Sequence, residues 1–87
     1  MPALHIVNQV AALADCLSVA GEDDSVLLIE SAVYAAADPW QERPLFALAP
    51  DVQARGLHGR LGTAVTLVSD GAFVDLVAAH QPIVSWR

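Results

Sequence analysis

One cysteine and three histidines are the side chains of this sequence best suited to nucleophilic or metal chemistry. Cys16 is the only cysteine among 87 residues, so no internal disulfide can form. A cysteine attacks as its thiolate, which is favoured beside a cation or at a helix N-terminus. Cys16 instead follows Asp15 in the middle of an expected helix. Taken alone, it is interpreted as a small buried or interfacial hydrophobe, and a nucleophilic role is the alternative.

The histidines do not follow a metal-binding pattern. His5, His58 and His80 are far apart, and none has a ligand partner at helical or hairpin spacing. We therefore expect no metal site and three unrelated histidines. Glu30 and Asp70 each follow an expected strand and could meet across a sheet, although acids at such positions more often cap helices or turns.

Short apolar runs alternate with helix-like segments along the chain. The expected strands are Ala3–Val7, Ser25–Glu30, Pro44–Ala49, Thr63–Ser69 and Pro82–Trp86. Four helices are expected. The first follows Asn8 and the last follows Asp70, with these two residues as caps. The second spans Ser31–Ala37, and the third begins at Pro50 and ends at Gly56. On the last helix we expect one apolar side formed by Phe73, Val74, Leu76 and Val77. Regular alternation predicts a single α/β domain over residues 1–87, with a mainly parallel five-stranded sheet and helices on both faces.

In such a sheet, ligands bind at the carboxyl ends of the strands. The expected strands place Asn8, Glu30, Ser31, Pro50 and Asp70 at that edge. A nucleotide site would need glycines there, and the sequence has neither the dinucleotide glycine pattern nor a phosphate-binding loop. We therefore expect no nucleotide cofactor.

Three aromatic residues are candidates for a protein interface. Tyr34 lies on Ser31–Ala37, which carries no charge on any face and which we expect another subunit to bury. Trp40, in the loop after it, is either an interface anchor or a lid over its own core. Trp86, near the carboxyl terminus, needs a surface against which to dock.

Composition also favours a partner. The chain is 55% hydrophobic, against about 45–50% for an ordinary soluble domain, and a small domain cannot hide that excess inside itself. Ten acids against four arginines leave a net charge of -6, which disfavours direct contact with nucleic acid or an anionic membrane. The first residues lack a basic segment and a long apolar core, so we expect no signal peptide. No apolar run approaches the roughly 20 residues of a membrane span. A reducing cytoplasm fits these features.

Several segments resemble the DsrH/TusB family of the DsrEFH/TusBCD sulfur-relay complexes. The similar segments, in order, are Leu4–Asn8, Asp15–Leu17, Ser25–Glu30, Val33–Ala36, Leu48–Asp51, Ala54–Gly56, Phe73–Leu76 and Val84–Trp86. They span nearly the whole chain. The family usually carries a Ser-Pro-containing loop after its first strand, whereas this chain runs on directly as Asn8-Gln9-Val10.

The resemblance implies a flavodoxin-like fold and a heterohexamer with two copies each of three related subunits. The implied partners are DsrE/TusD-like and DsrF/TusC-like subunits, with a DsrC/TusE-like sulfur acceptor reached through the complex. Persulfide sulfur would pass between cysteines, for 2-thiolation of the tRNA wobble uridine or for cytoplasmic sulfur oxidation. Cys16 matches a cysteine of DsrH-type members, which makes it a candidate persulfide acceptor.

Two further hypotheses stay open beside an accessory, non-catalytic subunit of a sulfurtransferase complex. The chain could carry sulfur itself on Cys16. It could also be a homo-oligomeric α/β binding module with no part in sulfur transfer. The fold suits all three, so the fold alone does not choose among them.

Overall fold

Five short strands form one sheet in the computed structural model, which describes residues 2–37 and 43–87. The strands are β1 (Leu4–Val7), β2 (Ser25–Leu28), β3 (Leu45–Leu48), β4 (Val65–Val68) and β5 (Ile83–Trp86). They lie in the order β4-β3-β2-β1-β5, and every neighbouring pair is parallel. The expected α/β class with a five-stranded sheet is confirmed, and the sheet is parallel throughout.

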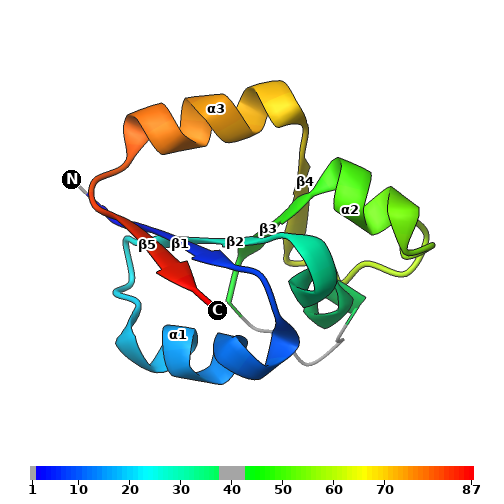
Figure 1. Cartoon of the computed structure of the whole chain (residues 1–87), viewed down its shortest axis with the longest axis horizontal. Coiled ribbons are helices and arrows are strands. Elements are labelled where there is room, and N and C mark those ends of the chain that lie inside the picture. The colour runs from blue at the N-terminus through cyan, green and yellow to red at the C-terminus, as the bar shows by residue number, and fades with distance from the viewer. Residues whose placement is uncertain (1, 38–42) are drawn as a thin grey trace.

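Helical segments cover both faces of the sheet. They are the 3₁₀ helices η1 (Val10–Ala12) and η2 (Glu30–Ala37) and the α-helices α1 (Leu13–Val19), α2 (Ala49–Ala54) and α3 (Asp70–Ala79). Figure 1 shows α1 and α3 on opposite sides of the sheet. Within the described ranges, no helix is long and apolar enough to cross a membrane.

The strand order reverses direction once. The first three connections step outward from β1 to β4, and α3 then returns the chain to the other side of β1 as β5 (Figure 1). The reversal therefore falls between β1 and β5. In open α/β sheets this is the place where a crevice forms at the carboxyl ends of the strands.

The pleat of the strands divides the core into two clusters. On one face, Val7, Val26 and Leu28 pack in a large cluster with Leu13 of α1 and Val52 of α2. On the other face, the fully buried residues of a smaller cluster are Leu4, Leu27 and Val68. Side chains alternate along a strand, so consecutive residues such as Leu27 and Leu28 serve different clusters. The α3 face thus has the thinner core.

The uncharged segment is buried by its own chain. It is the 3₁₀ helix η2, in which Ala32, Val33, Ala35 and Ala36 are all buried. The expectation that another subunit is needed to bury it was therefore wrong. The reason is that η2 packs between η1, α2 and β3, which together cover it. Tyr34 is the exception, because half of its side chain (51%) is exposed.

Neither of the two expected helix caps, Asn8 and Asp70, acts as one. Ser69, not Asp70, caps α3, because its Oγ accepts a hydrogen bond from the amide of Ala72 at 3.1 Å. Asn8 does not cap the first helical segment, which begins after Gln9 without a side-chain cap. Gly56, with φ at +68°, supplies the expected left-handed stop after α2.

Helix α3 is apolar on more than one side. Phe73 and Leu76 pack against the smaller cluster, whereas Val74 and Val77 are exposed by 68% and 38%. One apolar side formed by all four was predicted, and only Phe73 and Leu76 of the four pack against the core. None of the ten residues of α3 is buried.

Candidate functional site

A shallow pocket of ≈ 360 Å³ lies where β1, β2 and β5 end. Its lining residues are Ile6, Asn8, Ile29, Glu30, Ser85, Trp86 and Arg87. Of the five residues expected at this edge, Asn8 and Glu30 line the pocket, and the Ser31 hydroxyl donates to the carbonyl of Asn8 at 3.1 Å. Pro50 and Asp70 instead belong to α2 and α3. The pocket occupies the crevice that the strand order predicts.

Glu30 holds an uncommon backbone conformation at the rim of this pocket. Its φ is +50°, in the left-handed region that costs a residue with a side chain about 1–2 kcal/mol. Its amide donates to Oδ2 of Asp51 at 2.7 Å, which secures the turn from β2 into η2. Asp51, rather than Asp70, is therefore the acid that meets Glu30 across the sheet edge.

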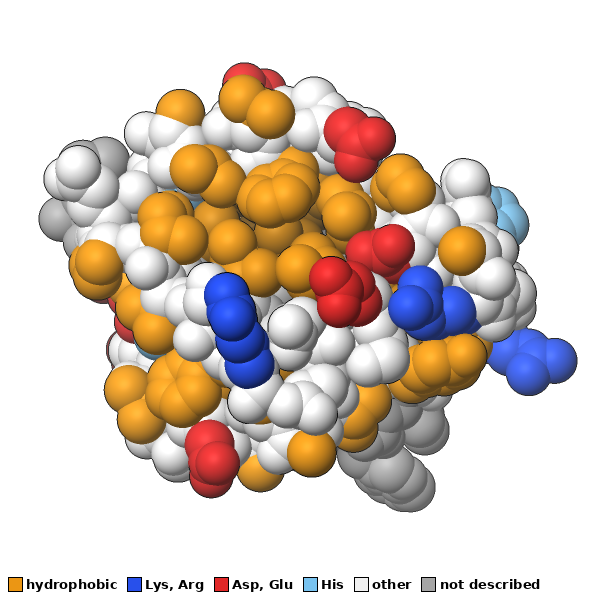
Figure 2. All heavy atoms as spheres, in the orientation of Figure 1, with side chains coloured by type: hydrophobic (Ala, Val, Ile, Leu, Met, Phe, Trp, Pro, Cys, Tyr) orange, Lys and Arg blue, Asp and Glu red, His pale blue; other side chains and the backbone are white. Residues whose placement is uncertain are grey.

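Apolar side chains surround the opening beneath α3. Ile6 and Ile29 of the pocket are partly buried members of the smaller cluster, together with Phe73. Figure 2 shows hydrophobic side chains gathered below α3, with acidic and basic side chains at their border. The pocket lining itself combines these apolar side chains with the polar residues Asn8, Glu30 and Arg87, and it has no glycine through which backbone donors could approach a phosphate.

Cys16 lies inside the protein, on the opposite face of the sheet from α3. Its side chain is fully buried in α1 within the larger cluster. Burial raises the pKa of the thiol from its ordinary 9.0 to about 11; the positive charge of Arg43 opposes this shift, and the negative charge of Asp24 adds to it. At neutral pH the side chain is therefore a thiol rather than a nucleophilic thiolate.

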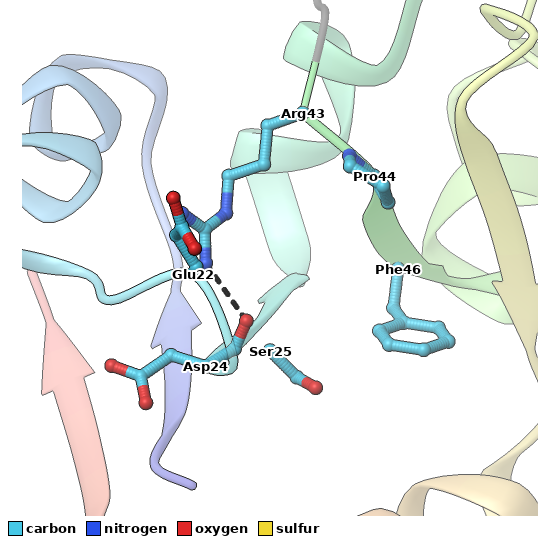
Figure 3. A pocket seen from close by; sticks show the side chains of 6 residues that line it. All are labelled: Glu22, Asp24, Ser25, Arg43, Pro44 and Phe46. Atoms are coloured by element: carbon cyan, nitrogen blue, oxygen red, sulfur yellow. Dashed lines mark hydrogen bonds between the residues drawn. The ribbon is translucent and has the colours of Figure 1, made fainter.

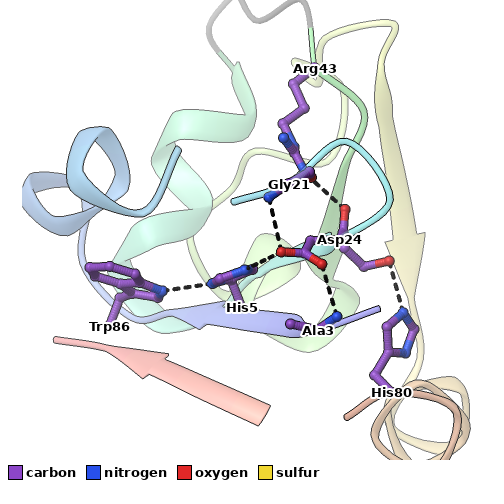
Figure 4. A network of polar contacts seen from close by, with 8 residues as sticks. Ala3, His5, Gly21, Asp24, Arg43, His80 and Trp86 are labelled. Carbon is purple, nitrogen blue, oxygen red and sulfur yellow. Dashed lines mark hydrogen bonds and ion pairs between the residues drawn. The ribbon is translucent and has the colours of Figure 1, made fainter. Parts of the chain in front are cut away.

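A partly buried hydrogen-bond network joins both termini to the turn before β2 (Figure 4). The indole of Trp86 donates to Nδ1 of His5 at 3.0 Å, and Nε2 of His5 contacts Oδ2 of Asp24 at 3.0 Å. Since the indole can only donate, Nδ1 accepts and Nε2 carries the proton. Asp24 also accepts from the amides of Ala3 and Gly21, both at 2.9 Å. These contacts hold the pKa of the Asp24 carboxyl well below its usual range, and the hydrogen bond from His5 contributes most to this lowering.

The sequence analysis did not predict this hydrogen-bond network, because it treated the three histidines as unrelated. The available signal was His5 itself, a polar residue inside an apolar strand that is only 3% exposed in the structure. A buried polar side chain needs hydrogen-bond partners, although sequence does not say which residues supply them.

The other two histidines have separate surroundings. His80 contacts the carbonyl of Leu76 through Nδ1 at 2.7 Å and the hydroxyl of Ser25 through Nε2 at 2.9 Å. His58 is exposed. Among residues 2–37 and 43–87, no three histidine, cysteine or acidic side chains lie close enough to share a metal ion.

A second pocket, of ≈ 290 Å³, lies at the amino ends of β2 and β3 (Figure 3). Its lining residues are Glu22, Asp24, Ser25, Arg43, Pro44 and Phe46. The guanidinium of Arg43 donates to the carbonyls of Gly21 and Asp24 at 2.7 and 2.8 Å. Arg43 therefore stabilises the turn that positions Asp24 beside His5. We interpret the residues of this pocket as structural, because Arg43 is bonded to that turn.

The three predicted interface residues have different outcomes. Tyr34 is exposed, as an interface residue must be in the free chain. Trp86 is partly buried, and it packs against the larger cluster of its own chain. Trp40 lies outside the described residues. A contact between any of the three and a partner stays a prediction.

Comparison with known proteins identifies the family. The model of the DsrH like protein family matches residues 7–83. The chain is 35% identical over 82 residues to the Protein TusB of Yersinia pestis (strain Pestoides F), covering 85% of this chain and 86% of that protein. The same identity and coverage hold for the Protein TusB of Yersinia pseudotuberculosis (serotype O:1b, strain IP 31758). This chain belongs to the DsrH/TusB family.

Proposed function

We propose that this chain is a packing subunit of a cytoplasmic sulfur-relay complex, in which related sister subunits carry the reactive cysteines. The sister subunits are of the DsrE/TusD and DsrF/TusC types, and a DsrC/TusE-type protein takes the sulfur onward. The final product is either the 2-thio group of the tRNA wobble uridine or an intermediate of sulfur oxidation. Membership of the DsrH/TusB family supports the relay role.

The observation that carries the packing role is the exposed apolar surface of α3. Seven of its ten residues are apolar, namely Ala72, Phe73, Val74, Leu76, Val77, Ala78 and Ala79, yet none is buried. A helix that is apolar on its outer side as well as its inner side is normally covered. Contiguous exposed apolar surface usually marks a protein interface.

The buried, protonated state of Cys16 also supports a packing role for this chain, with the reactive cysteines on the sister subunits. In a relay step, the thiolate of the acceptor attacks the outer sulfur of a persulfide, takes that sulfur, and releases the donor as a thiolate. Cys16 is a buried thiol with its pKa raised to about 11, so it is poorly suited to that attack in the free chain. The relay cysteines are therefore assigned to the sister subunits, and a role for Cys16 as auxiliary acceptor stays a prediction.

Co-expression with the neighbouring genes tests this function. We expect the chain to co-purify with two proteins of similar size, and native mass spectrometry to give a mass of two copies of each. A chain that remains a monomer in the presence of both sister proteins would contradict the proposal. A stable homo-oligomer without sister subunits would favour the binding-module hypothesis instead.

A further inference from the structure

Within residues 2–37 and 43–87, the outer edge of β4 carries none of the usual guards against pairing with another strand. Its residues, Val65-Thr66-Leu67-Val68, include no charge and no proline, and Thr66 and Leu67 are exposed. Edge strands of soluble proteins are normally guarded by charge, proline or a covering segment. The other edge strand, β5, is also uncharged, but Pro82 stands directly before it and Arg87 directly after it, whereas Ala64 and Ser69 flank β4. The difference singles out β4 as an edge that a partner covers.

An apolar groove runs beside this edge. It has a volume of ≈ 370 Å³ and lies between α3 and the outer strands; its lining residues are Phe46, Thr66, Leu67, Val68, Ala72, Asp75, Leu76 and Ala79. Thr66 and Leu67 point to opposite faces of the sheet, so the groove reaches around the edge of β4. A strand added beside β4 would place alternate side chains in such a groove, the usual source of specificity in strand addition.

Backbone geometry identifies the free donor of this edge. The amide of Leu45 in β3 donates to the carbonyl of Ala64. In a parallel ladder, residues alternate between facing one neighbour and the other. Ala64 and Thr66 therefore face β3, whereas Val65 and Leu67 face outward. The amide of Val65 already donates to the carbonyl of Gly62 at 3.3 Å, which leaves the amide of Leu67 as the outward donor for a partner strand.

The charge of the groove indicates which kind of partner strand binds beside β4. Asp75 is the charged residue among those that line the groove, and the whole chain carries a net charge of -6. A second copy of this chain would bring its own net negative charge close to Asp75. The β4 strand of that copy carries no basic residue that could pair with the Asp75 carboxylate. A different chain with lysine or arginine beside an apolar strand is complementary.

We propose that the edge of β4 and its groove accept an extended apolar strand from a sister subunit, with a lysine or arginine of that subunit beside Asp75. This inference rests on the proposed function and names the surface through which assembly occurs. It assigns the backbone of Leu67 and the carboxylate of Asp75 to the interface.

Hydrogen exchange on the co-purified complex provides the direct test. We expect the amide of Leu67 to exchange at least about tenfold more slowly in the complex than in the free chain, because it gains a hydrogen bond. Unchanged exchange at this amide in an assembled complex would overturn this inference and leave the proposed function standing. Failure of the wild-type chain to assemble would overturn both.

Two pairs of variants test the same interface by assembly. Leu67→Pro removes the outward amide, and Leu67→Thr shortens the same side chain but keeps that amide. Asp75→Lys reverses a charge in the groove, and Asp15→Lys reverses an exposed charge on α1, on the opposite face. We expect Leu67→Pro and Asp75→Lys to weaken association at least about tenfold, Leu67→Thr to weaken it less than Leu67→Pro does, and Asp15→Lys to assemble within about threefold of wild type.

Thermal melting of the free chains separates interface effects from misfolding. If Leu67→Pro does not fold, Asp75→Lys alone decides, because Asp75 is exposed on the helix. Wild-type assembly by a folded Asp75→Lys chain would overturn the proposed charge pairing. A homodimer of the wild-type chain that Asp75→Lys alters would show that a second copy, not a sister subunit, occupies the groove.

Discussion

The indole of Trp86 donates a hydrogen bond to Nδ1 of His5 at 3.0 Å, and this bond joins the last strand to the first. The two residues lie at neighbouring positions of β5 and β1, with Trp86 paired to Val7 in the ladder. Beyond His5, the contact continues to Asp24 and to the turn that Arg43 braces. The carboxyl-terminal strand is thus linked through side chains to the start of β2.

Replacing Trp86 with phenylalanine should destabilise the protein. The Trp86→Phe change leaves Nδ1 of the buried His5 without its donor, and an unpaired buried polar atom costs about 1–3 kcal/mol. Urea denaturation followed by circular dichroism measures the loss. Tyr34→Phe, at an exposed aromatic residue, should change the free energy of unfolding by less than about 0.5 kcal/mol. Equal stability of both variants would show that the Trp86–His5 bond contributes nothing.

Stability should fall in acid because of Asp24. The pKa of this carboxyl is depressed in the folded state, so its contribution is fully present above the unfolded value of about 4. It is lost as pH falls below that value toward the folded pKa. Urea midpoints measured between pH 7 and pH 2 should decline more steeply for wild type than for Asp24→Asn. Parallel curves for the two proteins would contradict this assignment.

Stability should also fall in alkali because of Cys16. Its folded pKa of about 11 exceeds the ordinary 9.0, so between these values the unfolded chain loses a proton that the folded chain keeps. Ionisation therefore favours unfolding as pH rises through that window. The Cys16→Ala variant should lack this component of the decline, and melting temperatures between pH 8 and pH 10.5 would reveal the difference. A wild-type decline no steeper than that of Cys16→Ala counts against the raised pKa.

The thiol of Cys16 should react slowly in the folded free chain. A pKa raised by two units lowers the thiolate fraction about 100-fold at pH 8, and burial slows access further. Iodoacetamide labelling followed by mass spectrometry should show this difference between native and urea-unfolded protein. Similar rates in both states would mean that the site opens readily.

The acceptor role of Cys16 needs a separate test in the assembled complex. Sister subunits could change the packing around α1, so the complex is the state to examine. After incubation with a persulfide donor, a mass increase of one sulfur atom on Cys16 would support the role. No adduct on Cys16, with an adduct on a sister subunit, would remove it.

Glu30 offers a test of backbone strain at the carboxyl edge of the sheet. With φ at +50°, Glu30→Gly should not lower stability, because glycine adopts this conformation freely. Glu30→Val should lower it by about 1–3 kcal/mol, since a β-branched residue tolerates the left-handed region poorly. Glu22→Gly serves as the control in another turn and should cost up to about 1 kcal/mol through the unfolded state. Equal losses for both glycine variants would argue against strain at Glu30.

Much of the architecture was predictable from local patterns. Apolar runs such as Val26–Ile29 identified buried parallel strands, because a strand covered on both sides is apolar on both sides. Gly56 marked a helix end because few residues other than glycine adopt a positive φ without cost. Asn8 and Glu30 were expected at the carboxyl edge of the sheet, and both line the pocket there.

What failed was the assignment of surfaces. The segment around Tyr34 (η2) and the helix around Val74 (α3) are both rich in apolar residues. The first is buried by its own chain, whereas Val74 and Val77 of the second are exposed. Hydrophobicity indicates that a segment must be covered, but the covering element comes from chain packing and not from the segment's own residues.

The sequence by itself determined the class of fold, the acidic charge, the apolar excess and the family resemblance, because each depends on residue type and local order. Only the tertiary structure decided that His5, Asp24 and Trp86 meet, that Cys16 is sealed inside, and that β4 keeps an open edge. His5 and Trp86 are separated by 81 positions, and contacts at that range depend on strand order. Local propensity does not encode that order, which emerges when the whole chain packs.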